Sequence, residues 1–67
     1  MYIVINGEDY DDLPDTLTLK ELITHLGLPE KKVAIECNRE VVSKSKFATH
    51  GLSNGDRLEI IHFIGGG

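Results

Sequence analysis

A short amphipathic segment at residues 18–26 is the feature that most constrains how this chain can fold. Thr18 is followed three residues later by Glu21, the spacing of a capping box in which each side chain bonds the other's backbone N–H. Gly27 then suits a left-handed helix cap, and Pro29 cannot continue a helix. The apolar residues in between recur at i, i+3, i+4 and i+7, as one stripe of a helix: Leu19, Leu22, Ile23 and Leu26. The pattern predicts one main helix over residues 18–26.

Strand patterns lie on both sides of this helix. Residues 2–5 are rich in β-branched side chains and end at Asn6-Gly7, the strongest short-range signal for a hairpin. Residues 8–13 can then return as a polar edge strand. Residues 32–38 alternate between apolar and polar, which is typical of a strand with one buried face.

The last third of the chain predicts two more strands. Val41 and Val42 indicate a brief one, and residues 57–64 form the final strand after a turn at Asn54-Gly55. Phe47 is expected to anchor the core, and Cys37 is expected to be a small buried hydrophobe.

This order of elements predicts an α+β fold with one helix packed across a mixed sheet. The first and last strands are the most apolar, so we expect them to be parallel neighbours joined by a right-handed crossover. That arrangement is a ubiquitin-like β-grasp, expected here as one domain over residues 1–64 followed by a flexible glycine tail over residues 65–67. The residues expected to be buried are Ile3, Ile5, Leu19, Leu22, Ile23, Leu26, Ile35 and Ile60.

Size and composition exclude several classes of protein. A chain of 67 residues has room for one small domain and none for an enclosed active site, so we expect no enzyme activity of its own. A net charge of −4 argues against a nucleic-acid binder. The single cysteine excludes an internal disulfide and a cysteine-based metal cluster, and we expect no metal site. Without a signal-peptide pattern or a membrane-length apolar run, we expect a cytoplasmic protein with no membrane contact.

The sequence ends in Gly65, Gly66 and Gly67, directly after the last apolar run. Folding does not favour glycines here, because glycine loses more backbone entropy than any other residue when it is ordered. A strand without side chains can instead pass through a narrow channel and present an ionised carboxylate to a phosphoanhydride. A frayed end is the alternative reading of the same residues.

With this ending, the chain resembles the ubiquitin-like sulfur carriers and, more narrowly, the ThiS family of thiamine biosynthesis. The segments that carry the resemblance are Ile5-Asn6-Gly7-Glu8, Thr18-Leu19-Lys20-Glu21-Leu22, Val33-Ala34-Ile35-Glu36, Asn54-Gly55-Asp56-Arg57 and His62-Phe63-Ile64-Gly65-Gly66-Gly67. The last of these is the specific one. Three positions depart from what the family usually carries, namely Cys37, Ser43 and Phe47, and none of them touches the glycine ending.

The resemblance implies a cycle run by partner enzymes. A ubiquitin-activating-type adenylyltransferase would use ATP and magnesium to adenylate the Gly67 carboxylate. Sulfur from a cysteine desulfurase would then displace AMP and leave a thiocarboxylate, whose sulfur thiazole synthase would take for the thiazole ring of thiamine. Gly65 and Gly66 would thread the channel, and the carrier itself would bind no cofactor.

Other functions share parts of this pattern. A molybdopterin-synthase small subunit has the same fold and ending, and a ubiquitin-like modifier would form an isopeptide bond with lysine instead. A plain interaction module would make no covalent use of Gly67. The sequence leaves the final destination of the sulfur open, as well as any contact made by His62.

The last strand also predicts a partner interface. Successive strand residues point to opposite faces, so its apolar residues cannot all enter one core. Ile61, Phe63 and Ile64 are therefore expected to lie partly exposed beside the glycines and to contact a partner.

Overall fold

The computed structural model describes residues 1–63, so the predictions made for Ile64, Gly65, Gly66 and Gly67 lie outside its described residues. It contains one α-helix, two short 3-10 turns and five strands within that range. In chain order these are β1 (Ile3–Ile5), β2 (Glu8–Tyr10), α1 (Leu19–Leu26), the turn Glu30–Lys32, β3 (Val33–Cys37), β4 (Glu40–Val42), the turn Lys44–Lys46 and β5 (Arg57–His62).

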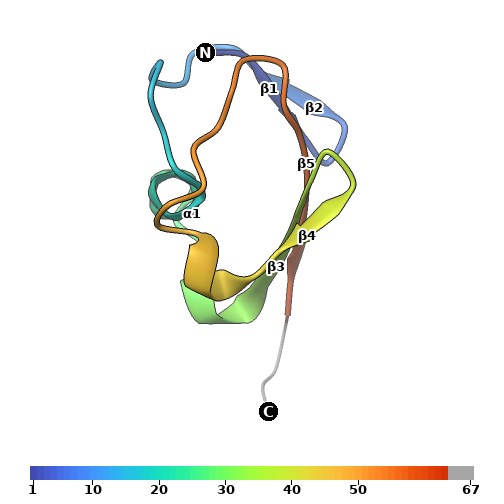
Figure 1. Cartoon of the computed structure of the whole chain (residues 1–67). Helices are drawn as coiled ribbons and strands as arrows, with labels where there is room; N and C mark the ends of the chain where they lie inside the picture. Colours follow the sequence, from blue (N-terminus) through green and yellow to red (C-terminus); the bar gives the residue numbers. More distant parts are fainter. Residues whose placement is uncertain (64–67) are drawn as a thin grey trace.

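The five strands form one mixed sheet in the order β2-β1-β5-β3-β4. β1 and β5 are parallel, with Val4 opposite Arg57, while β5 and β3 are antiparallel. The helix and the long connection to β5 lie on one side of the sheet, and no helix or strand of residues 1–63 covers the other side (Figure 1). The predicted β-grasp arrangement, with the first and last strands side by side, is confirmed.

The helix begins and ends where the sequence predicted. Thr18 Oγ1 accepts from the Glu21 N–H at 3.2 Å, and the Glu21 carboxylate accepts from the Thr18 N–H at 2.8 Å, which completes the capping box. Gly27 closes the helix in the left-handed conformation at φ 72°. Two N–H groups of the first turn donate to the segment before β5. The Leu19 N–H donates to the carbonyl of His50, and the Lys20 N–H donates to the carbonyl of Phe47. These bonds satisfy helix donors that have no partner inside the helix.

The core lies between α1 and the inner face of the sheet. Its largest side chain is Phe47, which is fully buried as predicted, and Cys37 is buried in the same core. Leu26 is only partly buried, because it lies on the last turn of α1, where the helix reaches the edge of the core. The other residues predicted to be buried are so, namely Ile3, Ile5, Leu19, Leu22, Ile23, Ile35 and Ile60.

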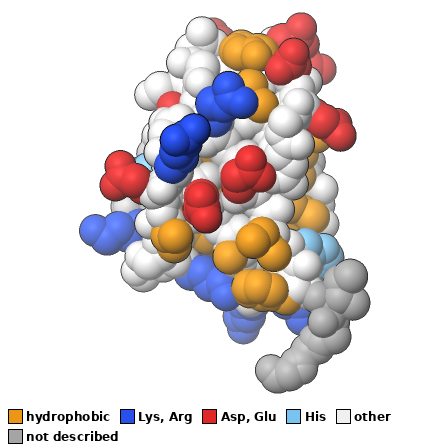
Figure 2. Space-filling model, turned by 90° about the vertical axis from the view of Figure 1, so that its right-hand side faces the viewer, with side chains coloured by type: hydrophobic (Ala, Val, Ile, Leu, Met, Phe, Trp, Pro, Cys, Tyr) orange, Lys and Arg blue, Asp and Glu red, His pale blue; other side chains and the backbone are white. Residues whose placement is uncertain are grey.

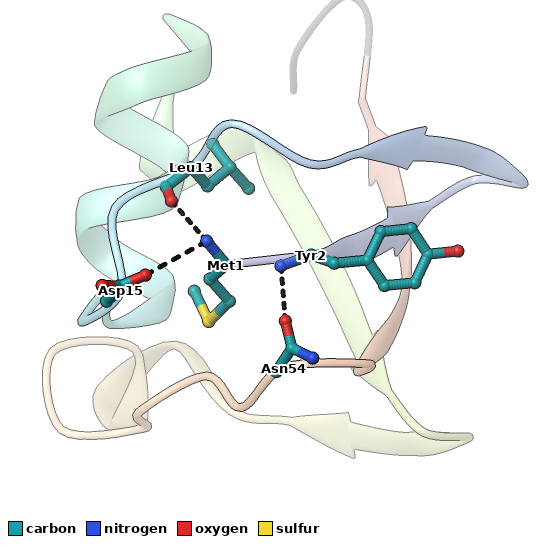
Figure 3. Close-up of polar contacts among 5 residues, drawn as sticks. All are labelled: Met1, Tyr2, Leu13, Asp15 and Asn54. Atoms are coloured by element: carbon teal, nitrogen blue, oxygen red, sulfur yellow. Dashed lines mark hydrogen bonds and ion pairs between the residues drawn. The ribbon is translucent and has the colours of Figure 1, made fainter.

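The first residue is tied into the fold. The Met1 ammonium donates to the carbonyl of Leu13 at 2.7 Å and pairs with the exposed carboxylate of Asp15 at 3.4 Å (Figure 3). The next N–H, that of Tyr2, donates to the side chain of Asn54 at 2.7 Å. These contacts join the start of β1 to the loops on both sides of it.

Two strand boundaries differ from the prediction by more than one residue. The second strand ends at Tyr10 rather than at residue 13, because the chain turns inward after Tyr10 and buries Leu13 in the core. The last strand ends at His62, one residue before the end of the described range. The division into a domain and a glycine tail stays a prediction, because residues 64–67 lie outside that range.

Candidate functional site

The end of β5 presents apolar side chains on the uncovered face of the sheet. Ile60 points inward and is 9% exposed, whereas Ile61 is 58% exposed and Phe63 is 49% exposed. The alternation follows from strand geometry, as the sequence predicted. Exposed apolar side chains are therefore present at Ile61 and Phe63, while Ile64, the third predicted interface residue, lies outside the described residues.

The exposed apolar surface is wider than the sequence indicated, because it extends across β3 onto β4. Val41 of β4 is 78% exposed and lies on the same face. The Lys44 ammonium lies 5.8 Å from the centre of the Phe63 ring, within the range of a cation–π contact. Figure 2 shows hydrophobic side chains gathered in the lower part of this face, below a group of acidic ones. We call this surface, made by Val41, Ile61 and Phe63, the outer apolar patch.

An asparagine side chain holds β5 just before the patch. Asn6 follows β1 in the tight turn to β2 and has φ 50°, a conformation that asparagine tolerates better than most residues. Its Oδ1 accepts from the Ile60 N–H at 2.7 Å, and its Nδ2 donates to the Ile60 carbonyl at 3.1 Å. The side chain thus continues the β1–β5 ladder after β1 has turned away.

A second asparagine holds the other end of β5. Asn38, with φ 51°, follows β3, and its Oδ1 accepts from the Arg57 N–H at 3.0 Å. Its Nδ2 donates to the Asp56 carboxylate, also at 3.0 Å, and its own N–H donates to the Arg57 carbonyl. The sequence did not predict that these two asparagines hold β5, because the residues they bond are distant in the chain. β5 is therefore held at its first residue, Arg57, and again at Ile60.

The remaining candidate residues are not assembled into a catalytic site. Cys37 is a free buried thiol, and its pKa is raised, first by burial and then by the negative charge of Asp56. A raised pKa keeps the thiol protonated and weakly nucleophilic. His25 is exposed on α1, and His62 lines a shallow groove of about 290 Å³ with Leu26 and other apolar residues.

Two further features are missing from residues 1–63. No group of three or more histidine, cysteine, aspartate or glutamate side chains lies close enough together there to hold a metal ion. In the same part of the chain, no helix has both the length and the apolar character that crossing a membrane requires.

The chain matches the ThiS family over residues 2–67. It is 36% identical to the sulfur carrier protein ThiS of Bacillus subtilis over 63 residues, which cover 94% of this chain and 96% of that protein. It is 45% identical over its whole length to a thiazole synthase of Paramagnetospirillum magneticum, and it spans only 20% of that protein. The chain thus covers about a fifth of the length of that relative.

A solved structure agrees with these sequence matches. The crystal structure of the thiamine biosynthesis protein (ThiS) from Geobacter metallireducens superposes with a TM-score of 0.84 at 30% identity, and the match covers both chains completely. The fold, the family match and the full-length likeness to a solved ThiS protein agree, and this chain belongs to the ThiS family.

Proposed function

We propose that this chain is a sulfur carrier whose Gly67 carboxylate is adenylated and then converted to a thiocarboxylate that supplies sulfur for the thiazole of thiamine. The observation that carries the proposal is the family match, which runs through the three glycines to Gly67. The likeness to the carrier ThiS of Bacillus subtilis and to a thiazole synthase supports the same pathway. The chain acts as a co-substrate of enzymes and is not an enzyme itself.

The chemistry needs little from the carrier beyond its terminal carboxyl group. An oxygen of the Gly67 carboxylate attacks the α-phosphorus of ATP, and pyrophosphate leaves. A sulfur nucleophile at the oxidation level of sulfide then attacks the acyl carbon and expels AMP, which leaves the thiocarboxylate. Adenylation removes the negative charge that protects a carboxylate from nucleophiles and provides a good leaving group. ATP and magnesium are bound by the partner enzyme in this scheme, and the carrier binds no cofactor.

The proposed partners follow from these steps. A ubiquitin-activating-type adenylyltransferase forms the adenylate, and a cysteine desulfurase provides the sulfur as a persulfide. A thiol reductant cleaves the persulfide and releases its sulfur at the sulfide level, while the thiol is oxidised to a disulfide. Thiazole synthase then consumes the sulfur of the thiocarboxylate. Gly65 and Gly66 pass through the narrow entrance of the adenylyltransferase, while Ile61, Phe63 and Ile64 contact its surface. Because the cycle consumes ATP and uses no membrane, we assign it to the cytoplasm.

Tail variants test the first step. Gly66→Val places a branched side chain in the narrow entrance, and one residue added after Gly67 moves the carboxylate by about 3.5 Å. Both variants should fold with an unchanged Tm and lose ATP–pyrophosphate exchange with the adenylyltransferase. Exchange at the parent rate by either variant would contradict the proposed use of the glycines.

The destination of the sulfur needs a separate experiment. The thiocarboxylate form should return to its original mass when incubated with thiazole synthase and the other thiazole precursors. Molybdopterin synthase with its own precursor should leave it unchanged, and a lysine-containing protein should form no isopeptide bond with it. The opposite pattern would assign the chain to one of the two alternative functions, a molybdopterin-synthase small subunit or a protein modifier.

A further inference from the structure

The register of the sheet places two glutamates side by side on its outer face. Glu36 of β3 lies directly opposite Glu59 of β5, and both side chains are exposed. Residues in this relation have Cβ atoms about 4.5–5.5 Å apart, and like charges placed there destabilise a sheet. Within residues 1–63, neither carboxylate has a lysine or arginine nitrogen within 4.0 Å. The two glutamates therefore do not stabilise the fold by facing each other.

Two arginines border the glutamate pair without neutralising it. Arg39 and Arg57 line the same open depression as Glu36 and Glu59, yet neither forms an ion pair with them in the part of the chain that the structure describes. Their positive charges weaken the attraction of this place for any cation, so a bound cation needs additional contacts there. A cation carried on a protein side chain can gain those contacts from the neighbouring apolar surface.

A small hollow joins the glutamate pair to the outer apolar patch. It has a volume of about 60 Å³, and its walls include Ala34, Val41 and Ile61 together with both glutamates. The hollow thus has an almost wholly apolar surface, and it lies directly beside the glutamate pair. A long basic side chain matches this arrangement, because its stem is apolar and its head is charged. Arginine fits better than lysine, since its planar fork can donate to two carboxylates at once.

We propose that the outer face of the sheet docks a protein partner that inserts one arginine between Glu36 and Glu59 and covers the outer apolar patch with apolar side chains. The inference deepens the proposed function and rests on it, because the partner is the enzyme that activates Gly67. A second copy of the chain is the alternative occupant, and the experiment below distinguishes the two.

The test compares two variants with equal change in charge. Glu36→Gln/Glu59→Gln removes the proposed arginine contact, and Glu8→Gln/Asp12→Asn removes two exposed acids in and after β2, at the sheet edge opposite to β4. Affinity for the adenylyltransferase is measured by calorimetry at low and high salt. The first variant should bind about 10-fold more weakly or worse, with a reduced dependence on salt and a Tm no lower than the parent's. The control should bind within about twofold of the parent.

Alanine substitution of each surface arginine of the enzyme then locates the partner residue. One arginine should show coupling, meaning that its loss no longer weakens binding to the Glu36→Gln/Glu59→Gln variant. Equal weakening by both charge variants, or coupling at no arginine, would overturn the inference while leaving the proposed function intact. A dimer of the parent that the glutamate variant cannot form would also overturn it. Failure of the parent chain to bind the enzyme at all would refute the proposed function, and this inference with it.

Discussion

Replacing Asn6 by alanine tests how the end of β5 is held. The substitution removes both hydrogen bonds to the Ile60 backbone. Each hydrogen bond contributes about 0.5–1.5 kcal/mol net, so their loss costs about 1–3 kcal/mol. Alanine at φ 50° adds about 1 kcal/mol, because a left-handed backbone is unfavourable for a residue with a Cβ. The free energy of unfolding should therefore fall by about 2–4 kcal/mol.

Urea denaturation and amide hydrogen exchange measure this effect. For a domain of this size, a loss of 2 kcal/mol lowers the Tm by about 8–16 °C. The Ile60 amide should also lose protection beyond the global change, since its acceptor is gone. Asn6→Asp is the matched control: it tolerates the same backbone and keeps the acceptor for the Ile60 N–H, so it should lose less stability. If Asn6→Ala unfolds with unchanged free energy, or if its Ile60 amide stays fully protected, the proposed role of Asn6 in holding β5 is refuted.

Two further predictions concern the core. Leu22→Ala should cost about 2–5 kcal/mol, because Leu22 is fully buried, whereas Val41→Ala on the outer face should stay within about 0.5 kcal/mol in the same urea titration. The Cys37 thiol should react slowly with iodoacetamide at neutral pH and quickly in urea, because burial and Asp56 raise its pKa in the fold. The folded state holds this proton more tightly, so stability should fall as the pH rises past about 8.5, and Cys37→Ala should remove that part of the pH dependence.

The helix was predictable because its signals are local. Thr18, Glu21 and Gly27 act within one or two turns of the chain, and the structure uses each as expected. The end of β2 at Tyr10 was not predictable in this way. The segment has the pattern of a polar strand, but its residue Leu13 is buried in the core. Local pattern could not indicate that a tertiary contact would end the strand early.

The candidate site was predictable in part. Strand alternation indicated that Ile61 and Phe63 share an exposed face, but only the register shows that Val41 extends it. The bonds from Asn6 to Ile60 span 54 residues, and no signal in the sequence reports that pairing. The position of Glu36 opposite Glu59 likewise depends on the register of β3 and β5. That register is set by the hydrophobic pattern and turns of the complete fold, so neither strand's own sequence predicts it.

The central claim is that the Gly67 carboxylate gains sulfur, and intact mass measures it directly. The chain is incubated with the adenylyltransferase, ATP, magnesium, a cysteine desulfurase, cysteine and a thiol reductant. A parallel reaction uses the chain extended by one residue. Exchange of one oxygen for sulfur should add about 16 Da to the parent, located at Gly67 by fragmentation, and nothing to the extended chain. No gain of mass by the parent, or an equal gain by the extended chain, would contradict the account.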